Sequence, residues 1–347
     1  IHGGPRAFPA MQGKVRPRIG AAEFFSVAER FGFSPEALKR LRAAVSDDDL
    51  PEGGANLARY YCPFPELVAG PRLEALARQK FGVKHALSVS SGTAALHAAF
   101  VAVGVGPGTE VICPAVGFMA TAAAVMLAGG VPVFCDVDES LHIDPAKLER
   151  AITPRTVALA PTHHWGGVAD MARVMEFARK HNLKVVEDCA QSPGAKYRGR
   201  YVGTIGDVGC FSISAYKIIG GGEGGLVITN DERLHERACQ LAECGGLWRQ
   251  DRFAPPRYEG ELFAGTNYRM SELEAAVDLV QLAKIDQVVR AYRQAKMRIV
   301  RQLKPYRQIV PQKINDVRGQ IGYMLRFYPQ TFELGDRIVK ALQAEGV

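Results

Sequence analysis

The regular alternation of two kinds of segment between about residues 72 and 230 most constrains the fold of this chain. Short apolar segments rich in β-branched residues alternate with longer segments of helical composition, which predicts an α/β fold with a mostly parallel, seven-stranded sheet between helices. Ligands of such folds bind beyond the carboxyl ends of the strands. The expected strands cover residues 85–90, 110–113, 131–136, 157–161, 183–187, 208–214 and 225–229, and the expected helices 93–103, 120–128, 145–151, 171–181 and 231–243.

Two ionisable residues follow expected strands directly. Asp188 comes after the strand at 183–187, and Lys217 comes after the strand at 208–214, just before a glycine-rich run at 220–225. A lysine amine can form a Schiff base with an aldehyde cofactor, and a carboxylate can keep a pyridine nitrogen protonated, so the pair indicates pyridoxal phosphate. The alternative is an ordinary ion pair, although a lysine in an apolar setting is a costly structural element.

A turn that could hold the phosphate of this cofactor lies further upstream. The strand at 85–90 runs into Ser91, Gly92 and Thr93, and a helical segment follows. Exposed amides and the helix dipole favour an anion at such a helix start, and glycine permits close approach. Ser90 or Ser91 can also serve as a simple N-cap, which is the alternative explanation of the turn.

Composition excludes several classes of protein. With 347 residues and 47% hydrophobic content, the chain can bury a large core. The seven cysteines are scattered and show no CxxC spacing, so we expect neither disulfides nor a metal site, and a reducing, cytoplasmic location. The first residues do not form a signal peptide, and proline and glycine interrupt the longest uncharged stretch, at 111–135, so no membrane span is expected.

The net charge of +7 is concentrated near the C-terminus, where residues 281–347 hold 13 basic and 5 acidic side chains. Between residues 284 and 307 the basic residues interleave with apolar ones at helical spacing. This pattern is typical of the solvated face of an amphipathic helix, so no nucleic-acid partner is expected.

The chain divides into three expected parts. Residues 1–69 form an N-terminal arm with helices, residues 70–282 the large domain, and residues 283–347 a small C-terminal α+β domain that looks incomplete. A loop at 245–266 precedes a long helix at 271–300. A strand at 321–328 and a helix at 334–345 are expected in the small domain.

From about Gly70 to Leu282, the chain resembles the DegT/DnrJ/EryC1/StrS family of pyridoxal phosphate-dependent sugar aminotransferases, which have the aspartate aminotransferase-like fold type I. The resemblance lies in the order of its motifs more than in any single one. The motifs are Gly70-Pro71 with Leu73-Glu74, Ser91-Gly92-Thr93-Ala94-Ala95-Leu96, Glu187-Asp188-Cys189-Ala190-Gln191-Ser192, Gly203-Thr204-Ile205-Gly206-Asp207, Phe211-Ser212, Lys217 with Gly222-Glu223-Gly224-Gly225, and Asn267-Tyr268-Arg269-Met270-Ser271.

The resemblance implies a role for each matching residue. Lys217 would form the Schiff base, and Asp188 would contact the pyridine nitrogen. A homodimer with shared active sites is also implied, because Asn267 would reach the phosphate bound by the neighbouring subunit. The other implied cofactor contacts are the phosphate ligands Gly92, Thr93 and Ser212, with Ser91 beside them, Gln191 at the phenolic oxygen, and Phe118 on the ring face.

These implied contacts also have structural alternatives. Phe118 could be a core aromatic, Ser212 a strand cap, and Gln191 a surface amide. The sequence alone leaves these alternatives open.

The chain departs from the family on the expected substrate side. Many members have His-Leu-Tyr-Gly-Gln where this chain has residues 163–167, His-His-Trp-Gly-Gly, and a Ser or Thr where it has Tyr216. Trp165 and Tyr216 suit a ring-bearing substrate. His163 and His164 could be a substrate base or a metal pair, but adjacent histidines on a strand point in opposite directions.

The leading interpretation is an aminotransferase that moves an amino group from glutamate or glutamine to a keto-sugar, cyclitol or related ring, in amino-sugar or antibiotic biosynthesis. The departures leave room for a pyridoxal phosphate-dependent oxidase, oxygenase-decarboxylase or aldolase acting on an amino acid. A pyridoxal phosphate-binding regulatory protein without turnover is the third alternative. Lys217 argues against a dehydratase, because dehydratases of this family have histidine at that position.

Overall fold

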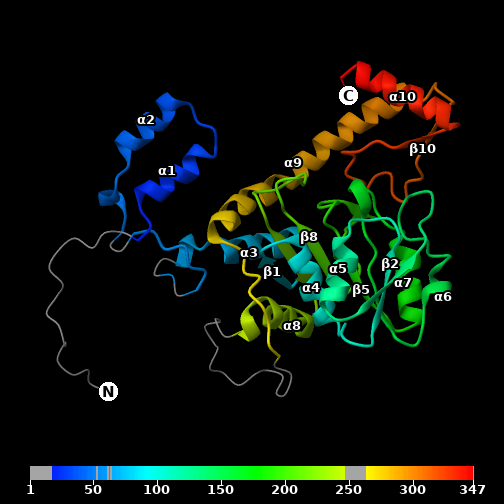
Figure 1. Cartoon of the computed structure of the whole chain (residues 1–347), viewed down its shortest axis with the longest axis horizontal. Helices are drawn as coiled ribbons and strands as arrows, with labels where there is room; N and C mark the ends of the chain where they lie inside the picture. The colour runs from blue at the N-terminus through cyan, green and yellow to red at the C-terminus, as the bar shows by residue number, and fades with distance from the viewer. Residues whose placement is uncertain (1–17, 52–53, 61, 63–64, 247–262, 347) are drawn as a thin grey trace. The chain divides into compact units, whose positions relative to one another are not determined.

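The computed structural model describes residues 18–51, 54–60, 62, 65–246 and 263–346. By internal contacts the chain separates into two units, residues 1–66 and 67–347 (Figure 1). The first unit contains helix α1 (Ala21–Glu29), helix α2 (Pro35–Ala44) and a short 3-10 turn, η1 (Asp47–Asp49). Helix α2 starts where the Ser34 hydroxyl accepts a hydrogen bond from the Ala37 amide and proline occupies the first helical position.

A seven-stranded sheet forms the centre of the second unit, in the order β1-β9-β8-β5-β4-β2-β3. Strand β9 runs antiparallel to both of its neighbours, and all other pairs are parallel. Six strands therefore end at one edge of the sheet, and β9 begins there. The strands are β1 (His85–Val89), β2 (Glu110–Pro114), β3 (Val131–Cys135), β4 (Thr156–Leu159), β5 (Lys184–Asp188), β8 (Val208–Ser212) and β9 (Gly225–Thr229).

Helices and two small hairpins complete the second unit. The hairpins pair β6 (Lys196–Tyr197) with β7 (Arg200–Tyr201), and β10 (Ile309–Pro311) with β11 (Phe327–Pro329). The helices are α3 (Ala69–Phe81), α4 (Gly92–Ala102), α5 (Ala120–Leu127), α6 (Leu148–Ala151), α7 (Met171–Lys180), α8 (Glu232–Ala242), α9 (Glu272–Leu303) and α10 (Phe332–Ala344), with 3-10 turns η2 (Pro65–Leu67), η3 (His164–Gly166) and η4 (Cys244–Gly246).

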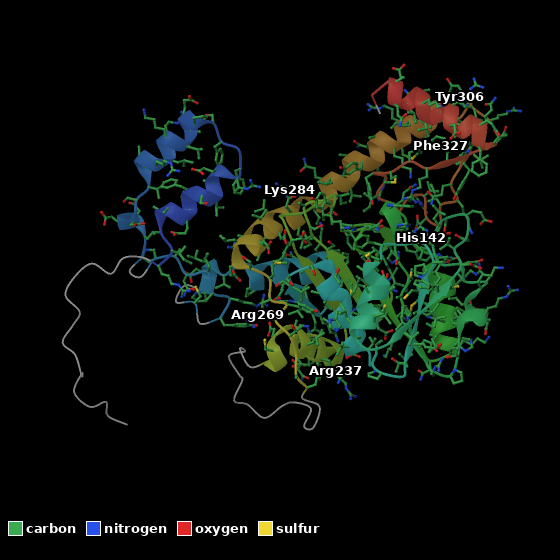
Figure 2. All side chains as sticks on the ribbon, viewed as in Figure 1. His142, Arg237, Arg269, Lys284, Tyr306 and Phe327 are labelled. Atoms are coloured by element: carbon green, nitrogen blue, oxygen red, sulfur yellow. The ribbon has the colours of Figure 1, made fainter. Side chains whose placement is uncertain are left out.

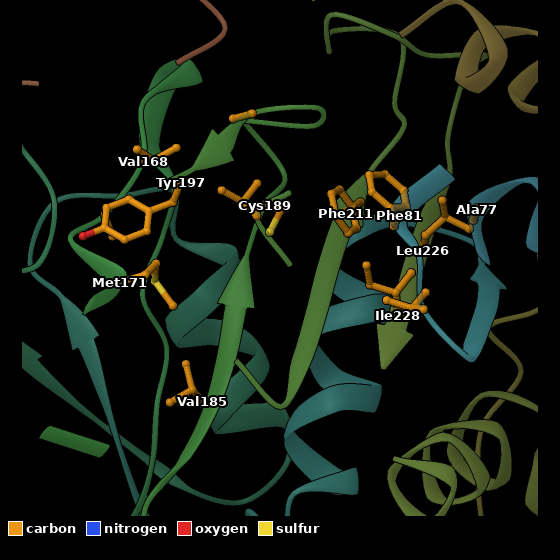
Figure 3. Close-up of a cluster of buried hydrophobic side chains, with 14 of the residues drawn as sticks. Ala77, Phe81, Val168, Met171, Val185, Cys189, Tyr197, Phe211, Leu226 and Ile228 are labelled. Carbon is orange, nitrogen blue, oxygen red and sulfur yellow. The ribbon is translucent and has the colours of Figure 1, made fainter. Parts of the chain in front are cut away.

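Apart from the edge strand β3, which is partly exposed, the strands of the sheet are largely buried on both faces, as is usual for parallel sheets. Alternate residues of a strand point to opposite faces, so Val185 and Val186 of β5 belong to two different apolar clusters. One cluster includes Phe81, Phe211 and Val185 (Figure 3). The other is built around α4. Packing from both sides thereby fixes the ends of β1, β2, β4, β5 and β8 along one edge.

The expected fold class is confirmed, and all seven expected strands are present. Helix α3 was not expected, and the strand expected at 321–328 is much shorter. Only residues 327–329 pair as β11, because the Ile321 amide donates to the Gly166 carbonyl and Gly322 has a φ of +91°. The expected domain boundary at residue 283 falls inside the continuous helix α9. Among the described residues, no helix is long and apolar enough to cross a membrane.

Candidate active site

The start of helix α4 is built for close approach of an anion. The Ser91 hydroxyl accepts a hydrogen bond from the Ala94 amide at 3.0 Å, which confirms the expected N-cap. The first amides of a helix have no partner within the helix, so those of Gly92 and Thr93 point outward. A Cβ on Gly92 would lie 2.6 Å from the Cβ of Ser212, which shows how closely the serine at the end of β8 approaches this turn.

The donor set at this turn fits a phosphate. The two helix-start amides and the Ser212 hydroxyl lie where the helix dipole favours negative charge, and Thr93 carries a further hydroxyl at the second helical position. Gly225, which begins β9, packs equally tightly, since a Cβ there would lie 2.3 Å from the Ser91 carbonyl oxygen. The two glycines therefore allow the turn, the end of β8 and the start of β9 to pack closely together.

Asp188 is fixed at the end of β5. Its side chain is almost fully buried, and its Oδ2 accepts a hydrogen bond from Thr121 Oγ1 at 2.6 Å, while its Oδ1 accepts one from the Ala190 amide at 3.0 Å. Each carboxylate oxygen can accept two hydrogen bonds, so one acceptor position remains on each. Such a carboxylate suits a protonated ring nitrogen. No motif in the sequence connects Thr121, which lies on α5, with Asp188.

Lys217 lines a cavity of about 310 Å³ next to this edge of the sheet. The cavity wall includes two more residues expected at the site, Gln191 and Trp165, and also Tyr216. Its full lining is Trp165, Ala190, Gln191, Pro193, Tyr216, Lys217, Ile218, Tyr292 and Tyr323. Tyr292 comes from α9 and Tyr323 from the segment before β11, and no motif in the sequence pointed to either.

Two backbone amides of the 3-10 turn η3 hold Gln191 in place. Its Oε1 accepts a hydrogen bond from the Trp165 amide at 3.1 Å, and its carbonyl accepts one from the Gly166 amide at 3.0 Å. Because Oε1 is already an acceptor, the side-chain NH₂ is left as a donor, which suits a phenolate oxygen. Trp165 has left-handed backbone angles (φ 52°, ψ 42°), which bulky residues rarely adopt and which occur often at functional sites.

His163 does not reach the cavity. Its side chain has no exposed surface, its Nδ1 accepts from the Ala169 amide at 3.2 Å, and its Nε2 lies 2.9 Å from Glu187 Oε2. Since Nδ1 is the acceptor, Nε2 must carry the proton and donate it to Glu187. Both ring nitrogens are therefore occupied. The placement favours a structural role over the substrate role suggested by the sequence.

Glu187 ties His163 to the loop before β8. Its carboxylate also accepts hydrogen bonds from the amides of Gly203, Ile205 and Gly206 at 2.6–2.9 Å. Burial alone would raise the pKa of Glu187, but the hydrogen bonds from His163 and the loop amides keep it below the usual value. In the described part of the chain, His163, Glu187 and Cys189 are the residues grouped closely enough to hold a metal ion. With both imidazole nitrogens bonded, this group is better explained as a structural network.

His164 and Trp165 stack on each other, with ring centroids 3.6 Å apart. The His164 amide donates to His142 Nε2 at 3.2 Å. His164 does not line the Lys217 cavity; it lines a second, small cavity that shares Trp165 with the first. Burial, together with the charge of Arg326, lowers the pKa of His164 to about 4, so the ring is neutral near pH 7.

Phe118 and Asn267 are both exposed. Phe118, which follows β2, has 62% of its surface exposed, so the alternative of a core aromatic is wrong. Asn267 Oδ1 accepts from the Arg269 amide at 3.2 Å, and the next residue, Tyr268, accepts from the Ser90 amide through its carbonyl at 2.7 Å. Asn267 thus lies on a segment that passes the phosphate turn.

Comparisons with known proteins agree with this geometry. The model of the DegT/DnrJ/EryC1/StrS aminotransferase family matches residues 69–347. GDP-perosamine synthase of Caulobacter vibrioides is 44% identical over 207 residues, which are 59% of this chain and 54% of that protein. A putative L-glutamine:3-amino-2,3-dideoxy-scyllo-inosose aminotransferase of Streptoalloteichus tenebrarius is 36% identical over 326 residues, which are 91% of this chain and 74% of that protein.

Solved structures show the same fold. DesV of S. venezuelae, in complex with a ketimine intermediate, superposes with a TM-score of 0.70 at 34% identity, over 80% of this chain and 72% of that one. NtdA of Bacillus subtilis, with bound cofactor PMP, superposes with a TM-score of 0.67 at 27% identity, over 78% of this chain and 61% of that one. The chain spans about half the length of the perosamine synthase it matches.

This chain belongs to the DegT/DnrJ/EryC1/StrS aminotransferase family. The family and its structural neighbours are pyridoxal phosphate-dependent enzymes of fold type I, so the expected family, fold, enzyme class and cofactor are confirmed.

Proposed function

We propose that this protein is an aminotransferase that moves an amino group from L-glutamate or L-glutamine to a keto-sugar or cyclitol. The observation that carries the proposal is the position of Lys217 on the wall of the 310 Å³ cavity, at the sheet edge where Asp188 is held by two hydrogen bonds. Membership of the aminotransferase family supports the proposal, and so do the names of the relatives, a GDP-perosamine synthase and a putative L-glutamine:3-amino-2,3-dideoxy-scyllo-inosose aminotransferase.

The chain's residues divide the work of the reaction. Pyridoxal phosphate, when bound, supplies an electron sink for the carbon that loses its proton. Asp188 would hold a proton on the ring nitrogen, and the Gly92–Thr93 turn with Ser212 would bind the phosphate. The Nζ of Lys217 would act as the base that removes a proton from the amino donor and returns it at the neighbouring carbon. Gln191 would donate to the phenolate oxygen.

The cavity suits a ring-bearing acceptor. Trp165, Tyr216, Tyr292 and Tyr323 offer flat apolar surfaces that also carry polar N–H and O–H groups, which match the faces and hydroxyls of a sugar or cyclitol. Amino-sugar or antibiotic biosynthesis is therefore the expected setting. A cytoplasmic location is proposed from the free cysteines, five of which are buried.

We also propose a homodimer with shared active sites. Four large apolar side chains near α5 and on the edge strand β3 are exposed: Phe118 by 62%, Met119 by 76%, Met126 by 65% and Phe134 by 60%. Apolar groups exposed together in this way are typical of protein interfaces. A second copy on this surface would cover Phe118 beside the site. Light scattering of an active sample tests the proposal, and an active monomer would contradict it.

The test of the proposed reaction is a half-reaction with the amino donor alone. The holoenzyme is mixed with L-glutamate or L-glutamine under argon, and the visible spectrum and the released keto acid are measured. An aminotransferase loses its visible imine absorption and releases one keto acid per site without oxygen. The departures at Trp165 and Tyr216 keep an oxidase or oxygenase as the second candidate, which would instead need oxygen for product formation and would leave the cofactor in its aldehyde form.

A further inference from the structure

Two basic side chains from the C-terminal part of the chain are partly buried, and neither has an acidic partner among the described residues of this unit. Lys296, on α9, donates to Gln320 Oε1 at 2.5 Å, and Arg326, just before β11, donates to Met324 Sδ at 3.4 Å. Neither forms an ion pair with a carboxylate anywhere in residues 65–246 or 263–346. Burying a cation without a counterion is unfavourable, so sites of this kind commonly bind an anion.

The two cations also act on each other. Burial lowers the pKa of Lys296, and the charge of Arg326 lowers it further. Burial likewise lowers the pKa of Arg326 to about 10, although the nearby Tyr323 and Tyr328 hydroxyls oppose this shift. A nearby basic residue on α9, Arg293, donates hydrogen bonds from its guanidinium to the carbonyls of Gln320 and Gly319. The local electrostatic potential is therefore positive.

This positive region adjoins the Lys217 cavity through one side chain. The guanidinium carbon of Arg326 lies 3.3 Å from the centre of the Trp165 ring, and Trp165 also lines the cavity that contains Lys217. The segment that carries Arg326 is fixed over the loop at 138–142, because Tyr328 donates to the Glu139 carbonyl and Gln312 to the Ser140 carbonyl. Figure 2 labels His142 and Phe327 on the two sides of this contact.

A small polar cavity lies between these groups. It is lined by residues that include His142, His164, Lys296, Asn315 and Arg326, and its volume of about 20 Å³ has room for a single oxygen atom of a bound group, about the size of one water molecule. His164 is 4% exposed, and its Nδ1 is buried without a hydrogen-bond partner among the residues that the structure describes. Buried polar atoms normally have partners, so this nitrogen points to a group that the protein itself does not supply.

We propose that Arg326 and Lys296, together with His164, form a subsite for an oxyanion of a substrate, next to Trp165 and the Lys217 cavity. The proposal rests on the proposed aminotransferase function, which supplies two sources of such a group: the carboxylate of the amino donor, or the phosphate of a nucleotide-linked acceptor. The planar guanidinium suits either group, because it can donate two parallel hydrogen bonds to one oxyanion.

The test uses the fluorescence of Trp165. The chain has two tryptophans, so Trp248→Phe leaves Trp165 as the single reporter, with Arg326 against its ring. Glutarate, which has carboxylates but no amine, and inorganic pyrophosphate are titrated separately into the holoenzyme. We expect a saturable change with at least one probe. The dissociation constant should rise tenfold or more in Arg326→Gln and in Lys296→Met, and Arg326→Lys should restore part of the affinity.

The matched control is Arg301→Gln, which removes the same charge from an exposed position of α9. Its dissociation constants should stay within twofold of the parent's. A response to glutarate assigns the subsite to the amino donor, and a response to pyrophosphate assigns it to the acceptor.

The proposal is overturned if neither probe saturates, or if both affinities are unchanged in Arg326→Gln. A weaker dimer in that variant, with unchanged probe affinities, would instead show that a partner subunit neutralises Arg326. Failure of the half-reaction with L-glutamate would contradict the proposed function without changing the outcome of these titrations.

Discussion

The carboxyl group of Asp278 on helix α9 provides a test of the packing behind Lys217. Asp278 has no exposed surface, and neither of its oxygens has a hydrogen-bond partner among the described residues. A Cβ on Gly221 or Gly224 would lie 2.5 or 2.4 Å from these oxygens, so the carboxyl group fills space beside the glycine-rich turn that follows Lys217. Burial, with a smaller contribution from Glu274, raises the pKa of Asp278 from 3.8 to about 7, although the nearby Gly221 amide partly opposes this shift.

The sign of the pH effect follows from this raised pKa. Between pH 4 and 7 the folded protein binds a proton at Asp278 that the unfolded chain has lost, so this group makes the fold less stable as the pH rises through that range. The shift of about three units corresponds to a penalty of roughly 4 kcal/mol above pH 7, as an upper limit. Asp278→Asn keeps the shape of the side chain and removes the ionisation.

We therefore expect Asp278→Asn to be more stable than the parent at pH 8, by about 2–4 kcal/mol, and nearly equal to it at pH 4. Urea unfolding of both proteins at half-unit steps from pH 4 to 8 measures the difference. Asp278 packs against the glycine-rich turn that links Lys217 to β9. Because Asp278→Asn keeps the shape of this side chain, the turn should keep its conformation and the variant should keep its bound cofactor at pH 8. A stability difference that is independent of pH, or that shrinks as the pH rises, would refute the argument.

Three further substitutions test the site. Gly92→Ala should weaken cofactor binding tenfold or more and destabilise the fold by about 1–3 kcal/mol, measured by equilibrium dialysis and thermal unfolding, whereas Gly106→Ala, whose Cβ would meet no atom within 4 Å, should change neither. Glu187→Gln should cost about 3 kcal/mol in urea unfolding at pH 7, because it breaks a buried network; a loss below 1 kcal/mol would contradict this role. Thr121→Val should lower kcat about tenfold with the cofactor retained, since Asp188 loses one hydrogen bond; an unchanged kcat would count against it.

Much of the fold could be predicted because its signals are local. Each strand of the sheet is a short apolar segment between turn residues, and most strands are largely buried on both faces, so the pattern is strong. Ser91 was expected as a cap because the serine, the glycine and the helix follow one another directly. Helix α3 escaped prediction because Gly70 and Pro71 lie in its first turn, where their composition indicates a loop.

The parts of the site that depend on distant segments could not be predicted. Thr121 meets Asp188 across 67 residues, and Tyr323 enters the Lys217 cavity from more than one hundred residues further along the chain. No spacing rule connects such positions. For His163 the sequence suggested too much. Its residue type and position indicated a substrate or metal role, but the side chain is fully buried and both ring nitrogens form hydrogen bonds within the protein.

The most direct test of the account is to locate the covalent link to the cofactor. The purified protein is loaded with pyridoxal phosphate, reduced with borohydride and digested, and the pyridoxyl-bearing peptide is sequenced by mass spectrometry. The account predicts the label on Lys217, which lines the cavity, and none on Lys196, which lies 21 residues earlier on the β6 hairpin with its Nζ over the Tyr201 ring. Label on Lys196 or any other lysine, or a Lys217→Ala variant that is still labelled and active, would contradict it.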